Sequence, residues 1–451
     1  MSRSVLPLGL FALLAAVRLI LAANLGLIED EAYYWVWSRH LAAGYFDHPP
    51  GIAWFIAAGT ALFGKSFLGV RVVPVLVGVV GAALLLPYAT DRVRYVFLVA
   101  GIPLYALGGV LATPDAPLFF GWCVALRGAL DRRWWLAGVG VGLASLGKYT
   151  GWGIWPLLVL GAPREWRSMA GGVMVTLGIV APNLAWNAAH AWQSVAFQVG
   201  HGLNRPPGGA LAFLGAQVGL SGPLFFVAGG IWAFAEARRG IAHPLGNQDF
   251  RTERILWSLS VPVVVFFTLA ASRGSGEANW AAPAYISVAL ALSRVEGRLA
   301  RLSWLASGTG IALSALVSAH LVRPIIELRG DPTARLGVGD DLARSVQAWG
   351  VEPVYTSRYQ EAALLSYYAD VEAYALPGVD RPDQYDLWPI RWSDHALFVR
   401  EFRSGVKATI DPFCSQRGGA NVISELDVDG SPIERWQVYE VSGCGPAAKA
   451  P

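Results

Sequence analysis

Long apolar runs alternate with short polar connectors over the first 320 or so residues of this 451-residue chain. The runs have membrane-spanning length and are continuously apolar, which favours α-helices over the alternating strands of a barrel. The apolar stretch at 49–64 is too short to span and is expected to lie at the membrane interface. About eleven spans are predicted, at 5–24, 67–88, 95–112, 116–130, 134–147, 149–163, 169–187, 210–235, 255–271, 281–294 and 302–322.

The composition changes near residue 323, where polar residues and short alternating runs replace the apolar segments. This pattern is typical of a small α/β domain. The fold class predicted is therefore mainly α: a polytopic membrane helical bundle over 1–322, followed by an α/β domain over 323–451. The N-terminal run is expected to be an uncleaved first span, in which Arg18 snorkels or pairs locally rather than contacting substrate.

The first long polar interruption, residues 25–51, reads LGLIEDEAYYWVWSRHLAAGYFDHPPG. It holds three consecutive acids, Glu29, Asp30 and Glu31, and the acid–imidazole pair Asp47–His48 before two prolines. A short connector between two helices needs none of these groups, and charge near a bilayer is costly. The first loop, taken as 25–66, is therefore predicted to be catalytic.

Basic residues predict the orientation. Under this span count they gather in alternate connectors, which places those connectors in the cytoplasm and the acidic loop outside. An odd number of spans places the C-terminal domain outside as well, so the expectation is a multi-pass inner-membrane protein with a periplasmic site. Whether Cys414 and Cys444 pair is left open. The cytoplasmic set comprises Arg92, Arg94, Arg132, Arg133, Arg164, Arg167, Arg238, Arg239, Arg251, Arg254, Arg294, Arg298 and Arg301.

Composition narrows the function classes. The chain is 54% hydrophobic and 15% charged, below the charged fraction of soluble domains. Its net charge of +3 is scattered among loops, so no nucleic-acid partner is expected, and its three cysteines exclude a disulfide-dense scaffold. There is no GxSxG, Walker, CxxC or HExxH pattern. Carboxylates, imidazoles and cations converging on one face suit a phosphorylated substrate, and a lipid-linked phosphate arriving from the bilayer fits best.

Five motifs in order resemble one family. They are EDEAYYW (29–35), GYFDHPP (44–50), TPDA (113–116), GKYT (147–150) and NWAAPAY (279–285). The chain resembles bacterial membrane glycosyltransferases of the protein O-mannosyltransferase superfamily (glycosyltransferase family 39 type), the group that includes the lipid A aminoarabinose and galacturonosyl transferases. The resemblance covers roughly residues 5–320. Segments 359–363 and 381–386 also look familiar from bacterial members.

The resemblance implies a C-type glycosyltransferase fold and a polyprenyl-phosphate sugar donor. It implies that the acid pair Asp30 and Glu31 holds the catalytic carboxylate and that Asp115 is the second acid of the site. Our hypothesis is that Asp30 is the base and that Glu31 or Asp115 orients the site. Where the aminoarabinose transferase has an acid–lysine pair, this chain has Asp47 and His48, which puts phosphate binding there in doubt. The remaining donor-phosphate or substrate-binding candidates are Lys148, Tyr149, Arg205, Glu277 and Asn279, and a possible divalent metal would be held by Asp47, Asp115 and His201.

The function predicted is an inverting glycosyltransferase that moves a sugar to lipid A, another glycolipid, a glycan or a protein. The alternative is a transporter or flippase of a lipid-linked glycan, which would place acids at mid-membrane depth in repeat-related helices. The acids here lie at helix ends on one side. The sugar, the acceptor, the oligomeric state and the role of the C-terminal domain are left open.

Overall fold

The computed structural model describes residues 2–203, 209–242, 250–273, 276–325, 336–401, 410, 412–428 and 431–446. The chain forms two compact units. The helical unit comprises Met1–Ala23, Ala42–Gly44 and His48–Ala319, and the sheet unit comprises Asn24–Leu41, Tyr45–Asp47 and His320–Pro451. Most of the polar stretch 25–51 therefore belongs with the C-terminal segment. The predicted division at 322/323 stays a prediction.

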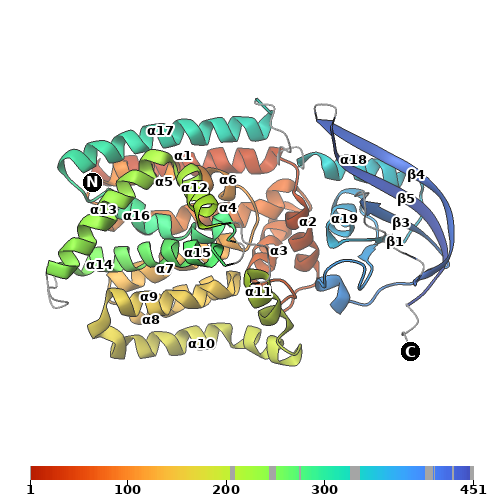
Figure 1. Cartoon of the computed structure of the whole chain (residues 1–451), viewed down its shortest axis with the longest axis horizontal. Coiled ribbons are helices and arrows are strands. Elements are labelled where there is room, and N and C mark those ends of the chain that lie inside the picture. The colour runs from red at the N-terminus through yellow and green to blue at the C-terminus, as the bar shows by residue number, and fades with distance from the viewer. Residues whose placement is uncertain are drawn as a thin grey trace. The chain divides into compact units, whose positions relative to one another are not determined.

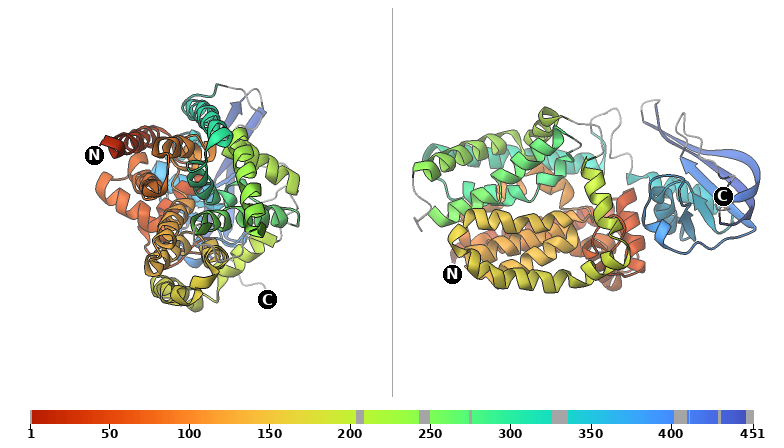
Figure 2. Two further views of the ribbon diagram at one scale, coloured as in Figure 1. Left: turned by 90° about the vertical axis from the view of Figure 1, so that its left-hand side faces the viewer. Right: turned by 60° about the horizontal axis from the view of Figure 1, so that its bottom comes forward.

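The helical unit is a bundle whose longer helices lie side by side (Figures 1 and 2). Its helices are α1 (Ser2–Asn24), α3 (Gly51–Phe63), α4 (Phe67–Ala83), α5 (Arg92–Ala100), α6 (Pro103–Gly108), α7 (Asp115–Leu130), α8 (Trp134–Gly147), α9 (Ile154–Gly161), α10 (Trp166–Ala189), α11 (Gln193–Leu203), α12 (Ala210–Ser221), α13 (Pro223–Ala242), α14 (Arg251–Ser258), α15 (Val261–Ala271), α16 (Ala284–Leu292) and α17 (Gly297–Val322).

Several helices are long and apolar enough to cross a membrane, so the chain is a multi-pass membrane protein. Within the described ranges, five helical segments meet length and composition criteria, at Val5–Asn24, Phe67–Tyr88, Pro163–Ala189, Arg251–Ala271 and Gly297–Val322. A sixth is a bent pair, α12 and α13, which meet at 108°. The predicted count of eleven spans is thus not confirmed. Where the sequence predicts one span over 210–235, Gly222 adopts φ +92°, a conformation that glycine reaches without strain, and the helix breaks.

Glycines bring α7 and α8 into backbone contact. A Cβ added to Gly121 would overlap the backbone nitrogen of Ala144, and one added to Gly140 would overlap that of Ala125. Small residues at such crossings allow the close approach typical of membrane helices. The result is a rigid hairpin whose open end carries Asp115, the first residue of α7, and Lys148, which directly follows α8.

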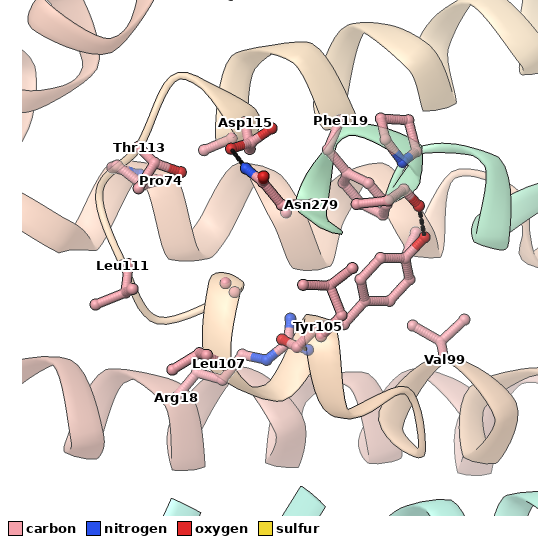
Figure 3. Close-up of a pocket in the computed structure, with 18 residues that line it drawn as sticks. Arg18, Pro74, Val99, Tyr105, Leu107, Leu111, Thr113, Asp115, Phe119 and Asn279 are labelled. Atoms are coloured by element: carbon pink, nitrogen blue, oxygen red, sulfur yellow. Dashed lines mark hydrogen bonds between the residues drawn. The ribbon is translucent and has the colours of Figure 1, made fainter. Parts of the chain in front are cut away.

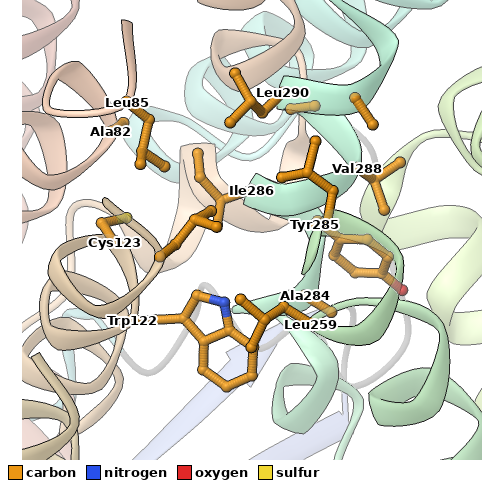
Figure 4. Close-up of a cluster of buried hydrophobic side chains, with 14 of the residues drawn as sticks. Ala82, Leu85, Trp122, Cys123, Leu259, Ala284, Tyr285, Ile286, Val288 and Leu290 are labelled. Atoms are coloured by element: carbon orange, nitrogen blue, oxygen red, sulfur yellow. The ribbon is translucent and has the colours of Figure 1, made fainter. Parts of the chain in front are cut away.

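The core of the helical unit is apolar and closely packed. Cys123 of α7 lies near Leu85, while Trp122 of the same helix lies beside Leu259, which follows α14, and below Ile286 of α16 (Figure 4). Cys123 is a buried free thiol and packs as a small hydrophobic residue of this core.

The sheet unit is a five-stranded mixed sheet in the order β2-β1-β3-β5-β4. The strand β1 pairs in parallel with β2 and β3, whereas β5 is antiparallel to β3 and β4. Helices α18 and α19 lie on the same side of the sheet (Figure 1). The elements are β1 (Val354–Thr356), β2 (Ala373–Ala375), β3 (His395–Glu401), β4 (Cys414–Val428), β5 (Ser431–Cys444), α2 (Glu29–Arg39), α18 (Val338–Gln347) and α19 (Tyr359–Leu364).

A disulfide joins Cys414 to Cys444, at the start of β4 and the end of β5. The question that the sequence leaves open is answered in the structure: the two cysteines pair. The bond lies in the sheet's own core, beside Phe413 and Tyr439.

Candidate active site

The acidic motif of the first loop opens helix α2 in the sheet unit. Acids in a first helical turn interact favourably with the helix dipole. The fully buried Glu31 accepts a hydrogen bond at Oε2 from the backbone N–H of Ile28 (3.2 Å), which closes the N-terminus of the helix. Glu31 therefore fixes where α2 begins and, through it, where Asp30 lies.

Asp30 accepts a hydrogen bond from the hydroxyl of Tyr359, 3.2 Å from its Oδ1. The pKa of Asp30 is raised to about 6, chiefly by burial and then by the charge of Glu29, while the Tyr359 hydrogen bond opposes the shift. A carboxyl group with a pKa of about 6 is ionised at neutral pH yet remains basic enough to accept a proton. This combination suits a general base.

Asp47 lies in the same unit and is 4% exposed. Its Oδ1 pairs with Arg381 Nη1 at 2.7 Å, and its Oδ2 accepts a hydrogen bond from the Tyr33 hydroxyl at 2.8 Å. The backbone N–H of Gln384 in turn donates to the Tyr33 oxygen at 2.7 Å. The guanidinium of Arg381 also lies 4.7 Å from the ring centroid of Tyr359. Arg381 thus contacts both Asp47 and the ring of Tyr359, whose hydroxyl donates to Asp30.

Sequence reasoning assigned no role to Tyr359, Arg381 or Gln384. The signal was present, because segments 359–363 and 381–386 were the two parts of the tail that resembled bacterial members of the family. Nothing in the local pattern shows that these segments contact the first loop more than 300 residues earlier.

A second cluster lies in the helical unit, where three predicted residues meet. Asp115 Oδ1 pairs with Lys148 Nζ at 2.7 Å, and Asp115 Oδ2 accepts a hydrogen bond from Asn279 Nδ2 at 2.9 Å. Both side chains of the ion pair are largely buried, with 14% of Lys148 and 24% of Asp115 exposed. The glycine-packed α7–α8 hairpin sets the ion pair, and the short turn before α16 adds the amide.

Asp115 and Asn279 line a cavity of about 200 Å³ (Figure 3). Apart from Arg18, Tyr105, Thr113 and these two residues, the walls are aliphatic, aromatic, proline or glycine. Asp115 and Asn279 lie on one side of the cavity, and Arg18 with Leu107 lies on the other (Figure 3). A site with apolar walls and a polar end suits an amphipathic ligand.

Other predicted residues lie elsewhere in the helical unit. The Nδ1 of half-buried His48 is 3.5 Å from Gln198 Nε2. The hydroxyl of Tyr149 donates to Ser194 Oγ and accepts from Asn187 Nδ2, both at 2.9 Å, so it braces α10 and α11 rather than Asp115.

Glu277 immediately precedes the turn that carries Asn279, and its carbonyl oxygen accepts a hydrogen bond from Trp280 N at 3.0 Å. Arg205 and the side chain of His201 lie outside the described residues.

The predicted metal set draws on both units, with Asp47 in the sheet unit and Asp115 in the helical unit. Among the described residues, no group of three or more His, Cys, Asp or Glu side chains could hold a metal ion. Asp47 is paired with Arg381 and Asp115 with Lys148, so each carboxylate already has a cation. The metal set of Asp47, Asp115 and His201 stays a prediction.

Three comparisons place the chain among known proteins. Residues 47–186 match the family described as "Dolichyl-phosphate-mannose-protein mannosyltransferase". The chain is 34% identical over 288 residues to the lipid A galacturonosyltransferase RgtD of Rhizobium johnstonii, covering 57% of this chain and 58% of that protein. It is 32% identical over 215 residues to an undecaprenyl phosphate-alpha-4-amino-4-deoxy-L-arabinose arabinosyl transferase of Pseudomonas aeruginosa, covering 38% of each.

These alignments span little more than half of RgtD and well under half of the arabinosyl transferase. The similarity in fold to solved structures extends over nearly the whole chain. The crystal structure of ArnT from Cupriavidus metallidurans bound to undecaprenyl phosphate matches with a TM-score of 0.68, covering 97% of this chain and 99% of that one at 16% identity. The apo structure of the same protein matches with a TM-score of 0.65. At this identity the match describes the fold alone.

Proposed function

We propose that the chain is a membrane glycosyltransferase of the protein O-mannosyltransferase superfamily, and that it transfers a sugar from a polyprenyl-phosphate donor to an acceptor with inversion at the anomeric carbon. The observation that carries the proposal is the cavity of the helical unit. Its apolar walls suit an isoprenoid chain, and the Asp115–Lys148–Asn279 cluster at one end suits a polar head group.

Asp30 acts as the general base in the proposed reaction. Its carboxylate takes the proton of the acceptor hydroxyl while that oxygen attacks the anomeric carbon. The bond between the anomeric carbon and the phosphate oxygen breaks, and the polyprenyl phosphate leaves with that electron pair. Tyr359 holds Asp30 by the hydrogen bond to Oδ1, and Glu31 holds the start of α2. Asp115, fixed by Lys148 and Asn279, orients the donor.

The names of the relatives suggest the substrates. RgtD and the arabinosyl transferase are named for a hexuronic acid and an aminopentose, so we infer a hexosyl or pentosyl donor carried on undecaprenyl phosphate or a similar lipid. Lipid A is the acceptor suggested first by the name of RgtD, with another glycolipid, a glycan or a protein as further candidates. The Cys414–Cys444 disulfide supports a periplasmic sheet unit and active site, because such bonds persist in oxidising compartments.

The test is sugar transfer by the purified full-length protein from a panel of radiolabelled polyprenyl-phosphate sugars to membrane lipid and protein. Wild type is compared with Asp30→Asn and with Glu29→Gln, which removes an acid from the same helical turn. We expect transfer by wild type and Glu29→Gln and none by Asp30→Asn. Undiminished transfer by Asp30→Asn would remove it as the base. Translocation of a lipid-linked sugar by wild type, with no transfer from any donor, would replace the enzyme with a transporter.

A further inference from the structure

Arg18 is a buried cation inside the first candidate span, six residues before α1 ends at Asn24. Its side chain is 6% exposed. The Nη2 donates to the carbonyl oxygen of Tyr105 at 2.7 Å, while the Nε has no hydrogen-bond partner within the described part of the chain. A charge at this depth is rare and costly unless it serves a site, and an unpaired buried donor adds to the cost.

Arg18 lines the same cavity as Asp115 and Asn279, and among the described residues that form its walls it is the one cation (Figure 3). Lys148, the other cation nearby, is already committed to Asp115. The free Nε therefore belongs to the group best placed to meet a negative charge inside the cavity.

The lining residues indicate how a ligand would lie along the cavity. Figure 3 shows Asp115 at one end of the cavity, Val99 at the other and Tyr105 between them. Val99 and Leu104 contribute the apolar inner walls, Arg18 donates to the carbonyl oxygen of Tyr105, and Asp115 marks the polar end. A ligand that fits has a hydrocarbon chain, then an anion, then a polar group.

We propose that Arg18 binds the phosphate of the polyprenyl-phosphate donor, with the prenyl chain along the inner apolar walls and the sugar towards Asp115. The assignment rests on the proposed function and names a phosphate-binding residue within it. A guanidinium matches phosphate oxygens because it presents N–H donors in a planar fork, of which Tyr105 takes one. The apolar inner walls select a lipid-borne phosphate over a free one.

The experiment measures binding of undecaprenyl phosphate and of undecaprenol, which has the same chain without the charge, to the full-length protein in nanodiscs. Wild type is compared with Arg18→Gln and with Arg18→Lys, which keeps the charge. The matched control is Arg71→Gln, since Arg71 is also a buried arginine of a candidate span that donates to a backbone carbonyl, Ala22 O at 3.2 Å, but does not line the cavity.

Arg18→Gln should raise the Kd of undecaprenyl phosphate by roughly tenfold or more and leave that of undecaprenol unchanged, as expected for loss of a charged hydrogen bond. Arg18→Lys should keep most of the preference for the phosphate, and Arg71→Gln should keep all of it. If wild type prefers the phosphate and Arg18→Gln retains that preference, the Arg18 assignment is wrong while the proposed function stands.

Two other outcomes have different meanings. Equal binding of both lipids by wild type would refute the proposed donor class, and the Arg18 assignment with it. Displacement of undecaprenyl phosphate by equimolar inorganic phosphate would mean that the site takes free phosphate, which would overturn the lipid assignment.

Discussion

The hydrogen bond from Tyr359 to Asp30 sets the pH at which the proposed base works. The change that removes it is Tyr359→Phe, because phenylalanine keeps the ring that packs 4.3 Å from Tyr33 and lies beneath Arg381. The hydroxyl that is lost also hydrogen-bonds Arg381. The other charged groups that act on Asp30 are Glu29, Asp47 and Arg381, and the substitution leaves all three in place.

The direction and size of the effect follow from the contacts. Burial raises the pKa of Asp30 from 3.8 to about 6, and the Tyr359 hydroxyl favours the ionised form. At 3.2 Å this hydrogen bond is long, so we assign it ~1.4 kcal/mol, the lower end for a charged partner, which is about one pH unit. The pKa in the variant should therefore rise to about 7. At pH 6 the ionised fraction falls from about one half to about one tenth, roughly a fivefold loss of activity.

The assay is the pH dependence of kcat/KM for sugar transfer between pH 5 and 9. A base must be ionised, so activity rises with pH through the pKa of Asp30, with a midpoint near 6 in wild type. The variant's midpoint should move up by about one unit, with equal rates above pH 8. The control is Tyr355→Phe, which removes a hydroxyl that donates to Arg391 O in the same unit. An unmoved or lowered midpoint in Tyr359→Phe would refute the reasoning.

Three further predictions concern the other charged groups and the disulfide. Lys148→Gln should lower kcat/KM at least about tenfold, because Asp115 loses the ion pair that orients it, and a loss under twofold in steady-state kinetics would contradict this. Asp30→Asn should raise Tm at pH 7 but not at pH 3.5. The raised pKa means that the folded protein retains a proton which the unfolded chain releases between about pH 4 and 6, so ionisation costs up to ~3 kcal/mol above that window. A Tm gain of equal size at both pH values would exclude this cause. Cys444→Ser should destabilise the sheet unit by ~3–4 kcal/mol through loss of the 30-residue closure with Cys414, and dithiothreitol should do the same to wild type in chemical denaturation.

Local patterns predicted the parts of the site that depend on helix ends. Thr-Pro-Asp at 113–115 begins α7 and Gly-Lys at 147–148 ends α8, so their juxtaposition follows once the two helices form a hairpin. The turn at Asn279 joins them as its motif suggested. The same motifs and apolar runs predicted the similarity to membrane glycosyltransferases and the membrane class, which the comparisons and the apolar helices support.

Features that depend on distant pairing were not predictable in this way. Tyr359 and Arg381 reach Asp30 and Asp47 through the tertiary fold, and no periodicity or spacing in the sequence records those contacts. The break between α12 and α13 was not predictable for a different reason. Hydropathy over 210–235 is continuous, so it does not show that Gly222 turns the backbone between α12 and α13.

Helix α2 is made early in synthesis but folds with segments made late. Asp30 and Tyr359 are 329 residues apart, and Tyr33 and Gln384 are 351 apart. At translation rates of about 5–20 residues per second, the acid-bearing helix waits roughly 15 to 65 s for its partners. The proposed base is therefore set in place only after nearly the whole chain has left the ribosome. Chains cut short before residue 359 would enter the membrane without the partner that donates to Asp30.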